Sequence, residues 1–158
     1  MDTKDIRDRT CKLVSNEGIS IPGNLPLLDE KMILRDKDEA LSRLLCIHAV
    51  AAASCGFDKA KALNWIQEEQ VEPLLTDGER RFLHTGKGRQ QDIMVKVEGA
   101  WAIAWGLSFV PKLDFWKDCD DNFVALLPNL KNNQSSAELR KKARFRKTDE
   151  VIAACDLA

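Results

Sequence analysis

Glu98 is the residue whose type and setting are best suited to chemistry. It is the only ionisable residue in the apolar stretch 97–110. At helical spacing it shares one stripe with Met94, Trp101 and Trp105. A carboxylate on such a stripe is costly to bury when it is ionised and unpaired. We therefore expect a cation beside it.

Arg43 is the cation that best matches Glu98, because the residues one and two turns further along its predicted helix are apolar. Two interpretations follow. In the structural one, a buried bidentate Arg43–Glu98 pair fixes the register of two core helices. In the functional one, Glu98 is a general acid or base in a pocket floored by Trp101 and Trp105. We favour the structural interpretation.

His48 has the only acidic or basic side chain in the apolar stretch 44–57. An imidazole there is suited to act as a base or as a pH-sensitive group. A histidine in such a setting is more commonly neutral and hydrogen-bonded in the core. Cys46 lies two residues away and points in another direction on a helix, so we expect no metal shared by the two.

Other motifs carry no predicted chemistry. The glycine–lysine–glycine loop at 86–88 lacks the spacing of a phosphate-binding loop. The acidic run at 118–122 lacks the spacing of a calcium loop. No signature of a catalytic serine or cysteine occurs. We therefore expect no cofactor and no metal.

A partner surface is predicted at Trp116 and at a basic segment, 140–147. Trp116 lies among charged residues, and exposed tryptophans are enriched at protein-binding hot spots. The basic segment is predicted to lie on a helix over 138–147. Its candidate contact residues are Arg140, Lys141, Lys142, Arg144, Arg146 and Lys147. An ordinary solvent-exposed helix face is the default interpretation of this segment. A contact with nucleic acid also stays open.

The composition predicts a folded protein with no strong electrostatic field around it. The 24 basic and 25 acidic residues give a net charge of −1, which disfavours a general nucleic-acid or membrane binder. The charged first residues lack a secretory signal, and the apolar runs are shorter than the ~20 residues that span a bilayer. Five cysteines without a C-x-x-C pair are expected to be free thiols in the cytoplasm.

Periodicity and capping residues predict an all-α fold, with one domain over 1–158. The expected architecture is a single compact bundle of about six to seven helices around a tryptophan-rich helix at about 90–107. Irregular connectors are expected at about 18–35, 109–120 and 128–136, where proline, glycine and polar residues gather.

Several motifs share their order and spacing with a known family. They are Glu39-x-x-x-Arg43, Trp65-Ile66, Thr76-x-x-Glu79-Arg80-x-Phe82-Leu83 and Glu98-x-x-Trp101-x-Ile103-x-Trp105-x-Leu107. Over about 6–157 the chain resembles an uncharacterised bacterial domain-of-unknown-function family, whose core helix reads E-x-x-x-x-L-x-W-x-L-G. Here Ser108 replaces the helix-ending glycine. The family pattern continues beyond Asp156-Leu157, so the chain is expected to be short at its C-terminus.

The resemblance implies a fold and no established activity, so two functions stay open. The first is a non-catalytic cytoplasmic protein that binds another protein, as an adaptor or a toxin-neutralising protein. The second is a small-molecule or enzymatic site lined by Arg43, His48, Glu98, Trp101 and Trp105, which requires a cavity open to solvent. We favour the first, because no catalytic constellation is present in the sequence.

Overall fold

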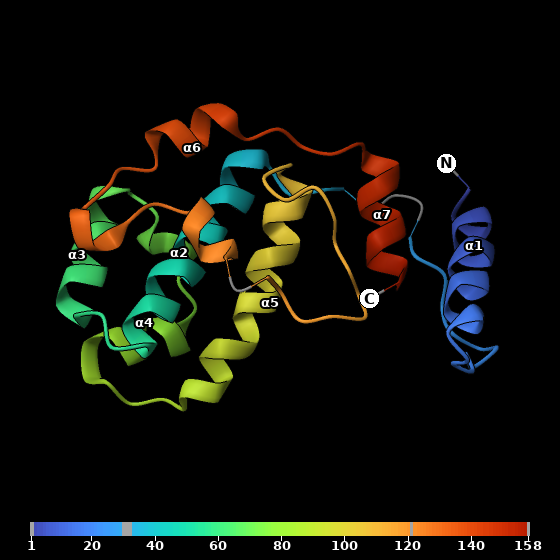
Figure 1. Ribbon diagram of the computed structural model, residues 1–158, viewed down its shortest axis with the longest axis horizontal. Helices are drawn as coiled ribbons and strands as arrows, with labels where there is room; N and C mark the ends of the chain where they lie inside the picture. Colours follow the sequence, from blue (N-terminus) through green and yellow to red (C-terminus); the bar gives the residue numbers. More distant parts are fainter. Residues whose placement is uncertain (1, 30–32, 121, 158) are drawn as a thin grey trace. The chain divides into compact units, whose positions relative to one another are not determined.

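The computed structural model describes residues 2–29, 33–120 and 122–157, and within these ranges it is helical, with no strand (Figure 1). The α-helices are α1 (Thr3–Asn16), α2 (Lys37–Ser54), α3 (Lys59–Glu68), α4 (Asp77–Thr85), α5 (Gln90–Gly106), α6 (Ala137–Lys142) and α7 (Thr148–Leu157). Three 3-10 helices are η1 (Glu72–Leu74), η2 (Phe123–Leu126) and η3 (Leu130–Asn132). The predicted all-α fold is confirmed.

The chain divides into two compact units. The larger unit, Asp36–Phe145, holds α2 to α6 and the 3-10 helices. The smaller unit, Met1–Arg35 with Arg146–Ala158, holds α1 and α7. The prediction of one domain over 1–158 stays a prediction.

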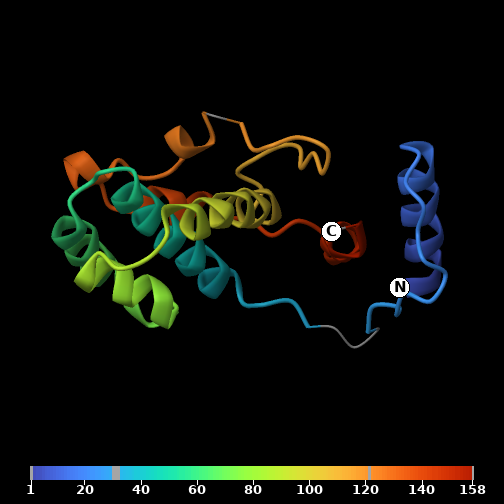
Figure 2. The same ribbon diagram turned by 90° about the horizontal axis from the view of Figure 1, so that it is seen from below.

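The core of the larger unit is built on α2. Asp36 caps this helix by accepting hydrogen bonds from the backbone N–H groups of Asp38 and Glu39. Every side chain from 44 to 50 is buried. Helix α5 lies alongside α2, as both views show (Figures 1 and 2). Helix α5 buries mainly its second half, at Ala100, Trp101 and Ala104, so α2 is the more buried of the two.

Helices α3 and α4 contact each other and α2. Asp58 caps α3 by accepting from the N–H of Lys61. Thr76 and Glu79 form a complete capping box at the start of α4, and Gly86 ends this helix with φ +70°. These boundaries follow from local chemistry that is visible in the sequence.

One prediction about the C-terminal part of the larger unit is wrong. The basic segment is helical only to Lys142, because Ala143 is fully buried and the N–H of Arg144 donates to the carbonyl of Leu107. There, burial against the core overrides the local pattern. The connector expected at 128–136 contains η3 and buries Leu130 and Ser136.

The smaller unit joins residues from the two ends of the sequence. Helix α1 contacts α7, and Arg7 makes an ion pair with Asp156 at 2.6 Å. The same guanidinium donates to the carbonyl of Pro26 at 2.9 Å. The Asp156 side chain is 1% exposed, so this ion pair is a buried link between distant segments.

Candidate functional site

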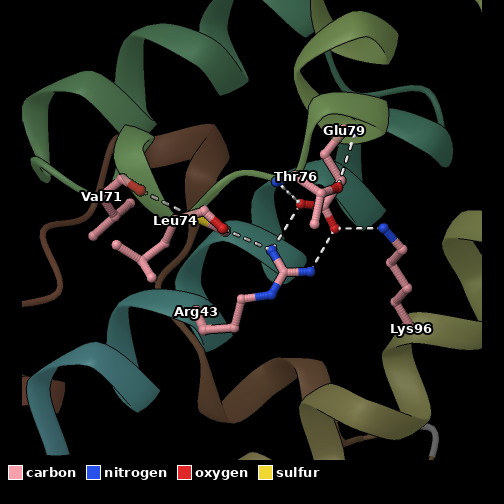
Figure 3. Close-up of polar contacts among 7 residues, drawn as sticks. Arg43, Val71, Leu74, Thr76, Glu79 and Lys96 are labelled. Carbon is pink, nitrogen blue, oxygen red and sulfur yellow. Dashed lines mark hydrogen bonds and ion pairs between the residues drawn. The ribbon is translucent and has the colours of Figure 1, made fainter. Parts of the chain in front are cut away.

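A buried carboxylate, Glu79, collects charged partners from two other helices of the larger unit (Figure 3). Arg43 of α2 donates to its two carboxylate oxygens, each at 2.7 Å. Lys96 of α5 donates to Oε1, also at 2.7 Å. The Glu79 side chain is 1% exposed. One carboxylate therefore ties α2, α4 and α5 together.

The backbone around η1 and α4 completes this cluster. The N–H of Thr76 donates to Glu79 Oε2 at 2.9 Å, and Arg43 donates to the carbonyl of Leu74 at 3.1 Å. Burial raises the pKa of Glu79, but the hydrogen bonds from Arg43, Lys96 and Thr76 outweigh it and lower the pKa to about 2. The carboxylate stays ionised, its oxygens are saturated with donors, and its role is structural.

The predicted Arg43–Glu98 pair is wrong. Arg43 bonds Glu79 in a bidentate manner, whereas Glu98 is exposed and accepts the N–H of Cys119 at 3.0 Å. Glu98 lies on the part of α5 that faces away from the core, so its carboxylate stays hydrated. The signal for the true partner was the capping box, which places Glu79 in the first turn of a helix beside apolar Phe82 and Leu83.

His48 is a buried, hydrogen-bonded core histidine. Its Nε2 lies 2.8 Å from the carbonyl oxygen of Pro128, and its ring meets Trp65 edge-on at 6.3 Å between centroids. Burial lowers the pKa of His48, against the opposing effect of the Pro128 carbonyl. The imidazole is therefore neutral near pH 7, which matches the second of the two interpretations from the sequence.

Two hollows of the larger unit share His48 in their walls. An open groove of about 970 Å³ lies between the C-terminal end of α2, the start of α3 and the η2–η3 segment. Asp58, Lys61 and Lys131 supply its charges. A smaller pocket of about 170 Å³ lies between α2, α5 and η2 and is almost wholly apolar.

The tryptophans of α5 do not form a site with Arg43 and Glu98. Trp101 is 7% exposed, and its buried Nε1 has no hydrogen-bond partner. Trp105 is half-buried against the core. Since Arg43, Glu98 and His48 bond to three different segments, the predicted five-residue pocket is not assembled.

Trp116 is 48% exposed in the loop that follows α5. Its backbone N–H donates to Asp114 Oδ1 at 3.1 Å, and Lys112 pairs with the other oxygen of Asp114. Lys112 and the Trp116 N–H lower the pKa of Asp114. Further along, the Glu98–Cys119 hydrogen bond ties the same loop back to α5. The structure therefore presents the indole on a braced loop.

The basic segment is largely engaged with its own surroundings. Arg140 donates to Ser136 Oγ and to the carbonyl of Glu69, and Arg144 donates to the carbonyls of Lys141 and Ala143. In the smaller unit, Arg146 pairs with Glu150. Lys141 pairs with Glu138, and Lys142 and Lys147 are exposed. The six residues do not form one uniform basic helix face.

The model of the family described as "Domain of unknown function (DUF4272)" matches residues 7–158. The chain belongs to this family. No curated protein and no solved structure matches it. The predicted membership of a domain-of-unknown-function family is confirmed, and the family description adds no activity.

The described part of this DUF4272 chain contains no metal-binding cluster and no membrane-spanning helix. Within 2–29, 33–120 and 122–157, no group of three or more His, Cys, Asp or Glu side chains is arranged to hold a metal ion. Asp121 of the acidic run lies outside these ranges. Every helix in the part of the chain that the structure describes is too short or too polar to traverse a bilayer.

Proposed function

We propose that this DUF4272 chain is a non-catalytic protein that acts by binding another protein, and that Trp116 is its principal contact residue. The exposed indole on its braced loop carries the proposal. A large aromatic side chain contributes much of the energy of a protein interface, and a loop that is already ordered loses little entropy on binding.

The polar residues that could act in catalysis are engaged in contacts within the fold, which supports the same proposal. Arg43 and Glu79 bond to each other and to backbone groups, and Glu79 also accepts from Lys96. His48 is bonded to a backbone carbonyl. An adaptor or a toxin-neutralising protein needs only a surface and a stable scaffold. The five cysteines are present as thiols and not as disulfides, which suits the cytoplasm of a bacterium.

The proposal is tested by substituting Trp116→Ala in the full chain and measuring the affinity for proteins enriched from the native cell. Leu126→Ala is the matched control, because Leu126 is a comparably exposed apolar residue, at 50%, on η2. We expect a partner whose affinity falls about 30-fold or more with Trp116→Ala, the loss of a hot-spot residue worth about 2 kcal/mol.

The control variant should bind that partner as the wild type does. If no protein binds, or if each bound protein tolerates Trp116→Ala as well as Leu126→Ala, the proposal is wrong. A circular dichroism spectrum of each variant confirms that its helices are intact.

Small-molecule binding is the second candidate, and the groove beside His48 supports it, since its volume of about 970 Å³ is in the range of ligand sites. It ranks second because His48 is committed to the Pro128 carbonyl and the groove is open. The two candidates differ in the expected effect of Trp116→Ala. If the groove beside His48 binds a small molecule, the affinity for that molecule should be unchanged by this substitution.

A further inference from the structure

Two sulfur atoms from different helices meet at the edge of the small apolar pocket. Cys55, which caps the C-terminal end of α2, places Sγ 3.8 Å from Sδ of Met94 on α5. Ser54 Oγ lies 3.7 Å from the same Sδ and 4.0 Å from Cys55 Sγ. Cys55 is exposed, Met94 is 40% exposed, and both residues line the small pocket.

The three atoms form a nearly equilateral triangle. A point equidistant from its corners lies roughly 2.2 Å from each atom, close to the ~2.3 Å bond between a thiolate sulfur and a first-row metal ion. Helix packing between α2 and α5 therefore holds the sulfurs at the separation that a trigonal metal site requires, without rearrangement of the backbone.

The chemistry of the donors selects the ion. A thiolate and a thioether are soft ligands, which favour Cu(I) over calcium, magnesium or manganese. The pocket walls beside them are almost wholly apolar and include Ala51, Val97 and Val124. One thiolate and one monovalent ion sum to zero charge, so the unit adjoins this apolar surface without an unpaired charge. A divalent ion would leave a net positive charge there.

We propose that Cys55 and Met94 bind one Cu(I) ion, with Ser54 Oγ at the third corner. On binding, the Cys55 thiol releases its proton to solvent, and Sγ and Sδ each donate a lone pair to the ion. No electron is transferred, and copper stays monovalent. The site is separate from the Trp116 surface, so it stands or falls independently of the proposed function.

The test uses the full chain with Cys11, Cys119 and Cys155 replaced by serine, so that Cys55 is the accessible thiol. Cys46 stays in place, because it is buried, donates to the carbonyl of Val71 and has a pKa raised by burial to about 12. Cu(I) is titrated without oxygen against the chromogenic chelator bathocuproine disulfonate, which removes copper held by a single thiol.

In this background we expect one Cu(I) per chain, no binding after Cys55→Ser, and an affinity about tenfold or more lower after Met94→Leu. Val95→Leu is the control on the same helix turn, since Val95 is 73% exposed and should leave the affinity unchanged. Met94→Gln repeats the loss of the thioether should the leucine variant misfold, as judged by circular dichroism.

The proposal is overturned if the background chain takes up no stoichiometric Cu(I) in competition with the chelator. It is equally overturned if Met94→Leu and Met94→Gln bind as tightly as the background chain, because the thiol alone then accounts for the binding.

Discussion

At the scale of single residues, Glu79 carries the strongest structural consequence. Its carboxylate joins Arg43 of α2, Lys96 of α5 and the first turn of α4, and it is 1% exposed. Buried charge pairs of this kind add little net stability compared with apolar packing, but removal of one member leaves the others uncompensated. The cluster therefore specifies how three helices meet.

We expect Glu79→Gln to destabilise the protein by about 3–5 kcal/mol, because Arg43 and Lys96 then face each other without an anion. Glu72→Gln is the control: it removes a more exposed ion pair with Arg80 and should cost about 1 kcal/mol or less. Urea unfolding at pH 7 measures both changes. Equal losses in the two variants would contradict the structural role of Glu79.

The same residue predicts a pH dependence. Its pKa is about 2 in the folded protein against 4.5 for an unperturbed glutamate, so its contribution is complete above about pH 4.5 and is lost as the pH falls toward 2. The loss is on the order of 3 kcal/mol. The free energy of unfolding, measured between pH 7 and 2.5, should fall more steeply in the wild type than in Glu79→Gln. Parallel curves would contradict the predicted contribution of Glu79. Because both proteins contain His48, its contribution is the same in both curves and does not affect the comparison.

At the scale of elements, glycine has opposite effects on stability at the end of a helix and in its interior. Gly86 ends α4 with φ +70°, a conformation that costs an alanine about 1–2 kcal/mol. Gly99 lies inside α5, is exposed, and has open space where a Cβ would be. The same substitution therefore has opposite consequences at the two positions.

We expect Gly86→Ala to destabilise the protein by about 1–2 kcal/mol and Gly99→Ala to stabilise it by about 0.5–1 kcal/mol. Each variant serves as the other's control, because the added methyl group is the same. Shifts of the urea midpoint with an unchanged slope report both values. A shift of the same sign at both positions would contradict the structure, in which α4 ends at Gly86 and α5 continues through Gly99.

At the scale of the whole molecule, the prediction of one domain is tested by cooperativity. Arg7→Ala removes the Arg7–Asp156 pair of the smaller unit, while Gly86→Ala weakens the larger one. For a single domain, calorimetry should show one transition that both variants shift, with equal calorimetric and van't Hoff enthalpies. Two transitions, each shifted by only one variant, would establish two independently folding units.

Local chemistry in the sequence determined most of the helix boundaries. Asp36, Asp58 and the Thr76–Glu79 capping box each start a helix, because each cap satisfies backbone N–H groups within a few residues. The all-α class follows from these caps and the helical periodicity, and the family follows from the order and spacing of the sequence motifs. Such short-range interactions need no knowledge of distant partners.

Tertiary structure alone decided which residues meet. Periodicity places Arg43 and Glu98 on helix faces, but it contains no information on how far each helix is rotated toward its neighbour, and Arg43 bonds Glu79 instead. Likewise, burial of Ala143 ends α6 early, and helix packing brings Met94 to Cys55. These contacts join residues far apart in the chain, so their energies depend on the packed arrangement of helices and not on spacing along the sequence.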